Sequence, residues 1–463
     1  MAGKAPIAAV ILAAGKGTRM KSALPKVLHE IGGRSMLGHV METVSALGVD
    51  KTVVVVGPDM DQVADAASGA DIALQHDALG TGHAVQAAEQ AIGQFDGTVF
   101  VLFADTPLVR QETFEAMRDI REGGAGVVVL GFTPDDPAAY GRLITDPSGD
   151  LEAIVEFKDA TDAQRAVRLC NAGLMAIDGN VLFGLLSKVT NDNAKGEYYL
   201  TDIVALARAQ GIACRVTEAD ADEVLGVNSR AQLAEAEAVF QARRRKTAME
   251  NGVTLHAPET VYFSADTELG ADVTVGPNVV FGPGVKVADG VTIKPFTHLE
   301  GAYVGASSDI GPFARLRPGT DLGAHVRVGN FVETKNAIVE DGAKINHLSY
   351  VGDAFVGARS NIGAGTITCN YDGFNKYLTV IEEDVFIGSN TALVAPVRLG
   401  KGANTGAGSV ISKDLAADAL GVTRAPQRQL DDGAAKYRSK KAAEKAAGKW
   451  GKPDPSSVKK TDD

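Results

Sequence analysis

The sequence predicts two domains of different fold class, an open, mostly parallel α/β sheet followed by a left-handed parallel β-helix. Three observations support this. Short apolar runs alternate with helical patterns up to residue 228, aliphatic residues recur every six positions beyond residue 252, and 463 residues are too many for one ordinary core. We therefore expect domains at 1–228 and 252–429, a linker helix at 229–251 and a tail at 430–463.

The apolar runs of the first domain have the composition of buried strands. They span residues 7–14, 52–56, 99–103 and 127–132, and the segments between them, such as 35–47 and 82–92, carry apolar residues at helical spacing. Such alternation is typical of an open, Rossmann-like sheet. The first run could pass for the core of a signal peptide. A glycine-rich turn follows it at once, which favours a strand that enters a phosphate-binding loop.

A helix is expected between the domains. Ser229 is the predicted N-cap, Gln232 completes a capping box, and Asn251 with Gly252 ends the helix. Its length of about 20 residues spans about 30 Å, as a rigid connector would.

Beyond this helix a six-residue period replaces the helical and strand periods. A hexapeptide β-helix explains it, because each flat face is one short strand with its aliphatic residue pointing inward. Glycine often follows that residue, which we interpret as tight corners with positive φ. The aliphatic positions are Leu269, Val275, Phe281, Val287, Ile293, Leu299, Ile310, Leu316, Leu322, Val328, Ile387, Leu393 and Leu399.

Two segments depart from the repeat. Residues 369–376 interrupt it with polar and aromatic residues, as a binding loop on one face would. Residues 436–463 hold nine basic and four acidic residues and almost no large apolar ones. We therefore predict that the tail is disordered, with a binding segment as the alternative.

Net charge, the length of apolar stretches and cysteine content argue against several classes of protein. The formal charge of −12 argues against a nucleic-acid partner, because a polyanion requires a basic face. Apolar stretches stay below about 18 residues, so the sequence predicts no membrane span. Three cysteines without CxxC spacing argue against a disulfide framework or zinc site and fit a reducing cytoplasm.

The N-terminal segment contains a candidate phosphate site. The turn Gly15–Gly17 follows a buried strand, so its backbone amides can bind phosphate, although it matches neither a Walker A loop nor a dinucleotide fingerprint. The segment from Met1 to His29 contains five basic residues and no acidic one. Asp105 ends an apolar strand, where open sheets bind ligands, and its carboxylate can hold Mg²⁺ or serve as a cap.

A series of motifs in this domain resembles the sugar-phosphate nucleotidyltransferases, with Ala104 where glycine is expected. The motifs are Leu12–Met20, Leu24–Leu28, Gln75 with Leu79–Ala84, Phe103–Pro107, Tyr140–Arg142, Glu156 with Lys158, Asn171–Gly173, Asn193–Tyr199 and Gly226–Asn228.

The resemblance implies a reaction between UTP and a sugar 1-phosphate that releases pyrophosphate. Arg19 and Lys26 are the implied catalytic cations, and Asp105 and Asn228 the implied Mg²⁺ ligands. The implied nucleotide-sugar site consists of Leu12, Ala13, Gly15, Lys26, Gln75, Gly80, Thr81, Gly141, Glu156, Asn171 and Asn228.

The repeat region contains a second candidate site. Arg317 and Lys335 lie three hexapeptides apart, which stacks them on one face, one coil above the other. Two stacked cations suit a sugar phosphate. His347 lies two hexapeptides further along, at an adjacent face, and is a plausible base for an ammonium substrate. The alternative is a trimerisation scaffold with a structural histidine.

Together these residues resemble the acetyltransferase half of the GlmU family of bifunctional bacterial enzymes, and the resemblance covers about residues 6–430. It implies that acetyl-CoA acetylates glucosamine 1-phosphate and that the product enters the first domain, on the route to peptidoglycan and lipopolysaccharide. It implies His347 as base, with the second site between the subunits of a homotrimer. The implied sugar-phosphate residues are Arg317, Lys335, Tyr350 and Asn361, and the implied acetyl-CoA residues are Ala364, Asn370, Tyr371, Ser389, Ala407 and Arg424.

Two other interpretations remain. A monofunctional nucleotidyltransferase with an inert repeat tail leaves the residues around His347 unexplained, and a scaffold that has lost both activities leaves Lys26 and Asp105 unexplained as well. Cys369 could act as an acyl carrier only with an activating neighbour, whereas direct attack by the amine needs no thiol.

Overall fold

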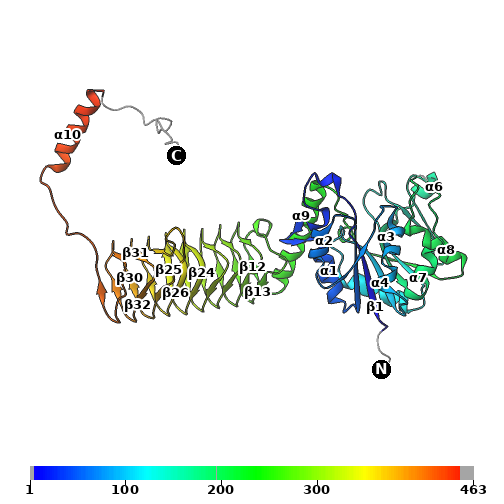
Figure 1. The fold of residues 1–463 in the computed structure, drawn as a ribbon, viewed down its shortest axis with the longest axis horizontal. Coiled ribbons are helices and arrows are strands. Elements are labelled where there is room, and N and C mark those ends of the chain that lie inside the picture. The colour runs from blue at the N-terminus through cyan, green and yellow to red at the C-terminus, as the bar shows by residue number, and fades with distance from the viewer. Residues whose placement is uncertain (1–4, 194, 449–463) are drawn as a thin grey trace.

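The computed structural model of the chain describes residues 5–193 and 195–448. It consists of an N-terminal α/β domain and a C-terminal β-helix, joined by a long helix, α9 (Figure 1). Within the described residues, no helix combines the length and the apolar character needed to cross a membrane.

The α/β domain is built on one mostly parallel sheet, as predicted. Its central strands β1 and β6 are almost wholly apolar and buried, because helices cover both faces of the sheet. Only β10 runs antiparallel to its neighbours in the main path. In spatial order the strands are β11 (Cys214–Glu218), β7 (Val127–Phe132), β10 (Cys170–Asp178), β6 (Thr98–Phe103), β1 (Ile7–Leu12), β4 (Lys51–Val56) and β5 (Asp71–Leu74), with β8 (Arg142–Thr145) and β9 (Leu151–Val155) added beside β10.

The helices divide between the two faces of this sheet, and each group closes a separate apolar core. The first core lies under α1 (Met36–Ala46), α2 (Asp61–Ala66) and α5 (Gln111–Glu122). The second lies under α3 (Thr81–Ala87), α4 (Glu89–Ile92), α7 (Gly179–Leu186) and α8 (Ile203–Ala209). The carboxyl ends of β1 and β6 stay open between the groups, and a ligand can enter there.

The second domain is a left-handed β-helix of short parallel strands. Most coils add about three hexapeptides of chain, as the register Val275, Ile293, Ile310 and Val328 shows. One face runs from β12 (Thr254–Leu255) to β35 (Leu420–Gly421), and the other faces are joined by the long strands β24 (Glu333–Val339) and β26 (Tyr350–Val356). The inward aliphatic residues form one core along the whole solenoid.

The prediction about the glycines of the repeat was wrong. Of the eight that follow an inward aliphatic residue within the predicted series, only Gly311 has positive φ. The reason for glycine is the spacing of the coils. A Cβ on Gly329 would lie 1.9 Å from the Asn346 carbonyl oxygen, and one on Gly305 would lie 2.4 Å from the Gly323 carbonyl group. Any side chain at these positions would push neighbouring coils apart.

The variant Gly305→Ala is therefore expected to destabilise the β-helix by about 1–3 kcal/mol, the usual cost of overpacking. Gly184→Ala is the control, since Gly184 lies exposed on α7 with no atom near its Cβ position, and alanine favours a helix. Thermal unfolding by circular dichroism measures both. An unchanged melting temperature for Gly305→Ala would contradict the close-approach explanation.

The linker helix α9 (Arg230–Glu250) is bonded to both domains. Gln241 is buried, and its amide group both donates to and accepts from the backbone of Phe263 in the β-helix, at 2.7 and 2.8 Å. The carbonyl of Gly32, in the turn of the hairpin β2 (Glu30–Ile31) and β3 (Arg34–Ser35), accepts bonds from Ser264 and Ala265. These bonds hold the two domains end to end.

The N-cap of α9 departs from the predicted capping box. Ser229 caps the helix, with its hydroxyl accepting from the amide of Gln232 at 3.3 Å. The side-chain carbonyl of Gln232, however, accepts from the amide of Asn228 at 2.9 Å instead of that of Ser229. The donor is therefore Asn228, one residue before the expected Ser229, and Asn228 belongs to a candidate site.

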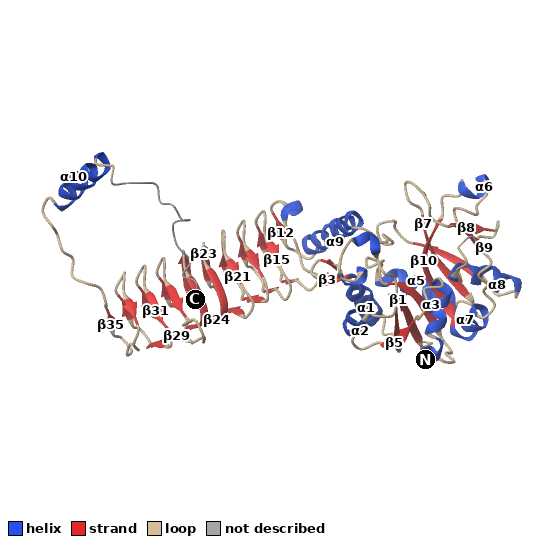
Figure 2. Cartoon of the chain, turned by 45° about the horizontal axis from the view of Figure 1, so that its top comes forward, coloured by secondary structure: helices blue, strands red, loops and turns tan. Residues whose placement is uncertain are grey.

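The predicted disorder of the tail was wrong for residues 433–446, which form the helix α10 (Gly433–Ala446). This segment is rich in alanine, lysine and glutamate, which have high intrinsic helix propensity. None of its residues is buried, and Figures 1 and 2 show α10 away from the solenoid beyond β35. The part of the prediction that concerns 449–463 lies outside the described residues.

Candidate active sites in the two domains

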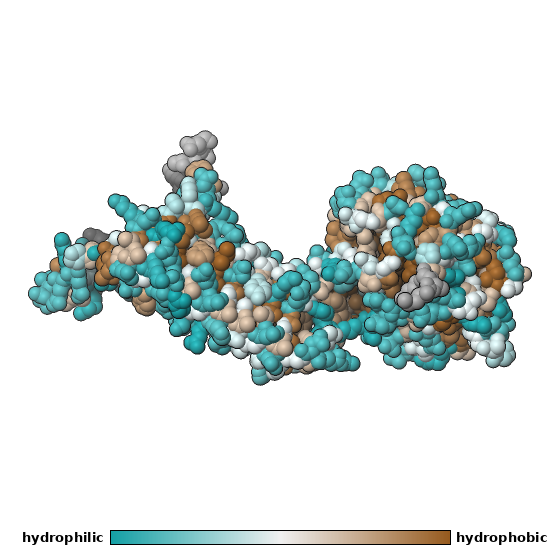
Figure 3. All heavy atoms as spheres, turned by 90° about the horizontal axis from the view of Figure 1, so that it is seen from below, coloured by the Kyte–Doolittle hydropathy of each residue, from teal (hydrophilic) through white to brown (hydrophobic). Residues whose placement is uncertain are grey.

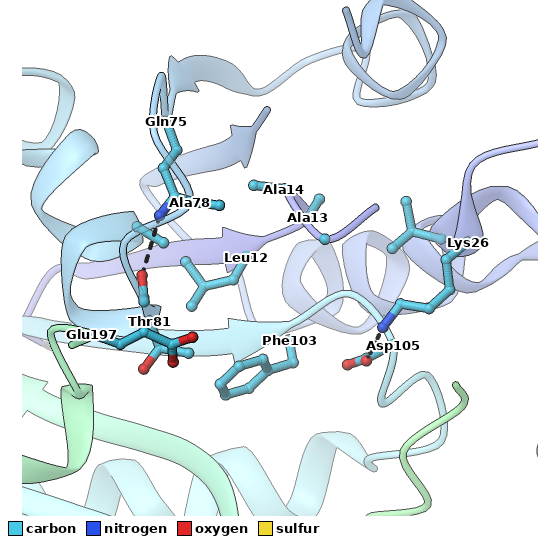
Figure 4. A pocket seen from close by; sticks show the side chains of 14 residues that line it. Leu12, Ala13, Ala14, Lys26, Gln75, Ala78, Thr81, Phe103, Asp105 and Glu197 are labelled. Carbon is cyan, nitrogen blue, oxygen red and sulfur yellow. Dashed lines mark hydrogen bonds and ion pairs between the residues drawn. The ribbon is translucent and has the colours of Figure 1, made fainter. Parts of the chain in front are cut away.

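A cleft of about 360 Å³ opens at the carboxyl ends of β1 and β6 (Figure 4). Its size is typical of a small-molecule site. Eight residues predicted for the nucleotide and metal sites line it: Leu12, Ala13, Gly15, Lys26, Gln75, Gly80, Thr81 and Asp105.

One wall of the cleft is preformed by the loop before α3. Gln75 is buried, and its amide nitrogen donates to the Gly80 carbonyl at 3.1 Å. Gly80 has a φ of 110° and lies close to Tyr198. A Cβ at position 80 would lie 2.6 Å from the Tyr198 carbonyl oxygen. The hydroxyl of Thr81 accepts from the amide of Leu200. A side chain at position 80 would therefore clash with the Tyr198 backbone and displace this wall of the cleft.

The opposite wall carries a cation between two oxygens. Lys26 Nζ donates to Asp105 Oδ2 at 2.5 Å and to Asn228 Oδ1 at 3.2 Å. The backbone amide of Val227 donates to the Asp105 carbonyl, which holds Asn228 beside the strand end. Asp105 and Asn228 thus present oxygen atoms to one positive charge, and this donor set fits Mg²⁺.

Phosphate oxygens and water would have to complete such a metal site. Between residues 5 and 448, residue 194 aside, no group of three histidine, cysteine or acidic side chains could hold a metal. Mg²⁺ commonly binds proteins through one or two carboxylates together with a substrate's phosphates. The observed pair fits that mode.

Three predicted sugar-binding residues form a cluster outside the cleft lining. The amide of Asn171 donates to the Gly141 carbonyl at 2.9 Å, and a Cβ on Gly141 would lie 3.7 Å from Glu156 Oε1. Gly173, in the same strand, packs against the ring of Phe103, which does line the cleft. Burial raises the pKa of the Glu156 carboxyl, while Lys195 opposes the shift.

Sequence reasoning missed part of the lining, and not every predicted residue belongs to it. Arg19 lies exposed on the turn η1 (Thr18–Met20) and does not line the cleft. Phe103 and Glu197 line the cleft without an assigned role, although both lie in motifs that the sequence analysis quoted. The other unpredicted lining residues are Ala14, Val27, Ala78 and Ala84.

His347 lines a second cavity, of about 350 Å³, at a corner of the β-helix. Its Nδ1 lies 2.7 Å from Oδ1 of Asn330, one coil earlier. Because an amide oxygen only accepts, Nδ1 carries the proton and Nε2 keeps a lone pair, as a general base requires. Asn330 was missed, although it precedes His347 by one turn of the solenoid and the repeat therefore places the two side by side.

The predicted phosphate-binding cations stack on the neighbouring face. The amide of Arg317 donates to the Thr334 carbonyl, and Lys335 follows directly. The pKa of Lys335 is lowered, first by the ammonium group of Lys376 and then by Arg317. Lys376 lies in the loop that interrupts the repeat and was not predicted. Three neighbouring cations on one face favour the binding of an anion.

Tyr350 belongs to this cation face, whereas Asn361 does not. The Tyr350 side chain lies over Gly352, which pairs with Lys335. Asn361 begins β27 (Asn361–Ile362) on the face of His347, and neither it nor the cations line the His347 cavity. Glu333 contacts the Arg317 guanidinium at 2.8 Å. Within one chain, the base and the cations lie on two sides of a corner.

Most predicted acetyl-CoA residues lie in a column along the His347 corner. The carbonyl of Ala364 accepts from Asn390, and that of Ser389 accepts from Gly408 on the next coil. Arg424 then donates to the Ala407 carbonyl at 2.7 Å.

Two predicted acetyl-CoA residues lie apart from this column. Asn370 is buried and donates to the carboxylate of Asp353, and Tyr371 lies exposed at the loop, where its hydroxyl donates to Gly373. The Cys369 thiol donates to the Ile367 carbonyl. Within the described residues, no histidine or carboxylate is bonded to this thiol.

Both domains match known families. Residues 9–170 match the MobA-like NTP transferase domain, and residues 266–301 and 378–413 match the bacterial transferase hexapeptide (six repeats). The chain is 58% identical over 442 residues to the bifunctional protein GlmU of Paramagnetospirillum magneticum, an alignment that covers 95% of this chain and 98% of the relative. It is 62% identical over 434 residues to the protein of the same name in Rhodospirillum rubrum, with 93% and 97% covered. A third GlmU, from Sphingopyxis alaskensis, is 57% identical over 448 residues, with 95% and 99% covered.

Proposed function

Since the chain belongs to the GlmU family of bifunctional enzymes, with a nucleotidyltransferase domain and a hexapeptide acetyltransferase domain, we propose that it makes UDP-N-acetylglucosamine in two steps. The β-helix transfers acetyl from acetyl-CoA to glucosamine 1-phosphate. The α/β domain then joins the product to UMP from UTP and releases pyrophosphate. The observation that carries this proposal is the presence of a cation-bearing cleft and a histidine base in one chain.

In the α/β domain, the residues of the cleft bind the nucleotide and offset its charge. The Gly15 and Gly80–Thr81 loops and Gln75 hold UTP, and the cluster around Glu156 and Asn171 holds the sugar. A phosphate oxygen of the sugar attacks the α-phosphorus, and pyrophosphate leaves. Lys26 and Arg19 offset the charge that develops. Mg²⁺ bound by Asp105 and Asn228 would supply further neutralisation of the phosphates.

In the β-helix, His347 accepts a proton from the substrate's ammonium group through Nε2, while Asn330 holds Nδ1–H. The amine attacks the thioester carbonyl of acetyl-CoA, the C–S bond breaks, and the proton that the new amide loses passes to the leaving thiolate of CoA. The sugar-phosphate residues, Arg317, Lys335, Tyr350 and Asn361, bind the acceptor. The acetyl-CoA residues, Ala364, Asn370, Tyr371, Ser389, Ala407 and Arg424, bind the donor along the corner column.

We further propose that the enzyme is a homotrimer in the cytoplasm. Phe296, Phe313 and Phe331 stack along one corner with ring centroids 4.9 and 5.2 Å apart, and each is about half exposed. Figure 3 shows apolar side chains exposed on the β-helix. A second copy that covers this phenylalanine ladder reaches the His347 cavity, because Phe313 and Phe331 line it. The free cysteines and the substrates fit a cytoplasmic location.

Two assays on the purified chain test the proposed function. One follows pyrophosphate release from UTP and N-acetylglucosamine 1-phosphate with Mg²⁺, and the other follows CoA release from acetyl-CoA and glucosamine 1-phosphate. Chelation of Mg²⁺ by EDTA is expected to abolish only the first. If the chain releases no CoA, the alternative interpretation, a monofunctional nucleotidyltransferase, is correct.

The variant Glu156→Gln is expected to raise KM for the sugar 1-phosphate by about 10-fold, from the loss of a charged hydrogen bond. It is also expected to be at least as stable as wild type at pH 7. The pKa of the Glu156 carboxyl is higher in the folded chain than in the unfolded chain. The free energy of unfolding therefore falls as the pH rises from the unfolded-state pKa through the folded-state pKa. The side-chain amide of the variant does not ionise, so the variant avoids that loss. Its advantage in melting temperature over wild type should therefore vanish at about pH 4. A less stable variant at pH 7 would contradict this account.

The variant Phe331→Asp is expected to convert the trimer into monomers and to lower acetyl transfer by at least about 10-fold, because a charge replaces a buried anchor of the interface. Light scattering after size exclusion gives the mass. Tyr262→Asp, a similarly exposed aromatic residue off the ladder, is the control. If wild type is itself monomeric, the trimer proposal is wrong.

A further inference from the structure

The first turn of α9 contacts the uridylyl-transfer site from outside the cleft. Asn228 precedes the N-cap Ser229, and its backbone amide donates to Gln232 Oε1 at 2.9 Å. In an ordinary capping box this side chain would accept from the backbone amide of Ser229, whereas here it accepts from the Ser229 hydroxyl and from the Asn228 amide. Gln232 therefore fixes the orientation of the residue whose own side chain meets Lys26.

Arg230, on the same turn, reaches the loop that carries Lys26. Its Nε donates to the Met20 carbonyl at 3.3 Å and its Nη1 to His29 Nδ1 at 3.4 Å. Met20 ends η1, and His29 follows η2 (Lys26–Leu28). Both are buried, whereas residues 21–24 between them are exposed. One side chain thus connects the two buried ends of a segment whose first half, residues 21–24, is exposed.

His29 suits this contact because its ring is neutral. A guanidinium group only donates, so Nδ1 must accept, and the proton lies on Nε2. Burial lowers the pKa of His29, and the charge of Arg230 lowers it further. The ring therefore stays an acceptor near neutral pH and keeps its contact with Arg230.

We propose that Gln232 and Arg230 are positioning residues for uridylyl transfer, which hold Asn228 and the Lys26 loop in register over Asp105. Neither lines the cleft. This inference rests on the proposed uridylyltransferase activity and extends it to the linker helix. A displacement of about 1 Å in a catalytic group can cost on the order of 10²-fold in rate, so small losses of register should be measurable.

The test compares Gln232→Ala, Arg230→Ala and the double variant in the full-length chain. Each single change is expected to lower kcat for pyrophosphate release by about 10-fold and the double change by about 10²-fold, with KM for both substrates within about 2-fold. CoA release, from the other domain, should be unchanged, and unchanged KM values for UTP and the sugar 1-phosphate report that the α/β domain has folded. Gln232→Glu should restore most of the activity, because a carboxylate also accepts from the Asn228 amide.

Arg245→Ala is the matched control on the same helix. The Arg245 guanidinium donates to the carbonyls of Glu259 and Val261, far along α9 from the cleft, so pyrophosphate release should stay at the wild-type rate. The inference is overturned if the double variant keeps wild-type kcat, or if Gln232→Glu is as impaired as Gln232→Ala. A wild-type chain that releases no pyrophosphate would instead refute the proposed function.

Discussion

Replacing Lys26 by alanine is expected to lower kcat for uridylyl transfer by about 10²–10³-fold and to leave acetyl transfer unchanged. The ammonium group lies at the point where the strand-end carboxylate and the Asn228 amide oxygen converge, with only 11% of the Lys26 side chain exposed. A preorganised charge in such a partly buried site stabilises the transition state far more than a charge in water does. Because the interaction strengthens as phosphate charge develops, kcat should fall more than KM rises.

Lys16→Ala is the control for this experiment. Lys16 belongs to the same basic segment but is exposed and does not line the cleft. Its loss should change the rate by no more than about 2-fold at physiological salt, since an exposed charge is screened. Steady-state pyrophosphate release measures both variants. Equal effects of the two changes would mean that the general positive charge of the segment matters, rather than the position of Lys26.

The fold follows from the sequence where one strong pattern decides it. The runs that became β1 and β7 are continuous apolar segments, which a sheet covered on both faces requires. The six-residue period likewise determines which residues enter the solenoid core. These patterns depend only on burial. Burial therefore explains why the expected architecture and the observed one agree.

The details that sequence reasoning missed depend on contacts between distant segments. The glycines of the repeat are needed because successive coils touch, which local turn preferences do not reveal. Lys376 reaches Lys335 only because an inserted loop folds back along one face. Both contacts join segments that lie far apart in the sequence.

The candidate sites likewise contain residues whose placement follows from a sequence pattern and residues whose placement does not. The residues of the first cleft come from loops at the ends of adjacent strands, so their convergence follows from the sheet. Asn171 lies in β10, the antiparallel strand of the main sheet, and Glu156 follows β9 of the added pair β8–β9, so the two form a neighbouring cluster. In the β-helix, the spacing of Arg317 and Lys335 predicts their stacking. The further spacing of two hexapeptides predicts that His347 lies on an adjacent face, as observed. The cations do not line the His347 cavity, which is why a second chain is proposed to complete the site.

His347→Ala is expected to lower kcat for acetyl transfer by about 10²–10⁴-fold, the usual contribution of a general base, while pyrophosphate release stays unchanged. The reason is geometric. The bond to Asn330 fixes the proton on Nδ1, so Nε2 is the free nitrogen, and the cavity beside it is large enough for a substrate. Asn330→Ala should give a smaller loss, of about 10-fold, because the ring keeps its chemistry but loses its orientation.

The control for His347 is His325→Ala. His325 is an exposed corner histidine of the same solenoid, outside the cavity, and its removal should leave CoA release unchanged. If His347→Ala keeps most of its activity while Cys369→Ala loses it, an acyl-enzyme on the thiol would replace direct attack by the amine. The bond of that thiol to the Ile367 carbonyl argues for the opposite result, since a backbone carbonyl is too weak a base to generate the thiolate. The ranking of these variants by CoA release therefore decides between base catalysis and covalent catalysis in the β-helix.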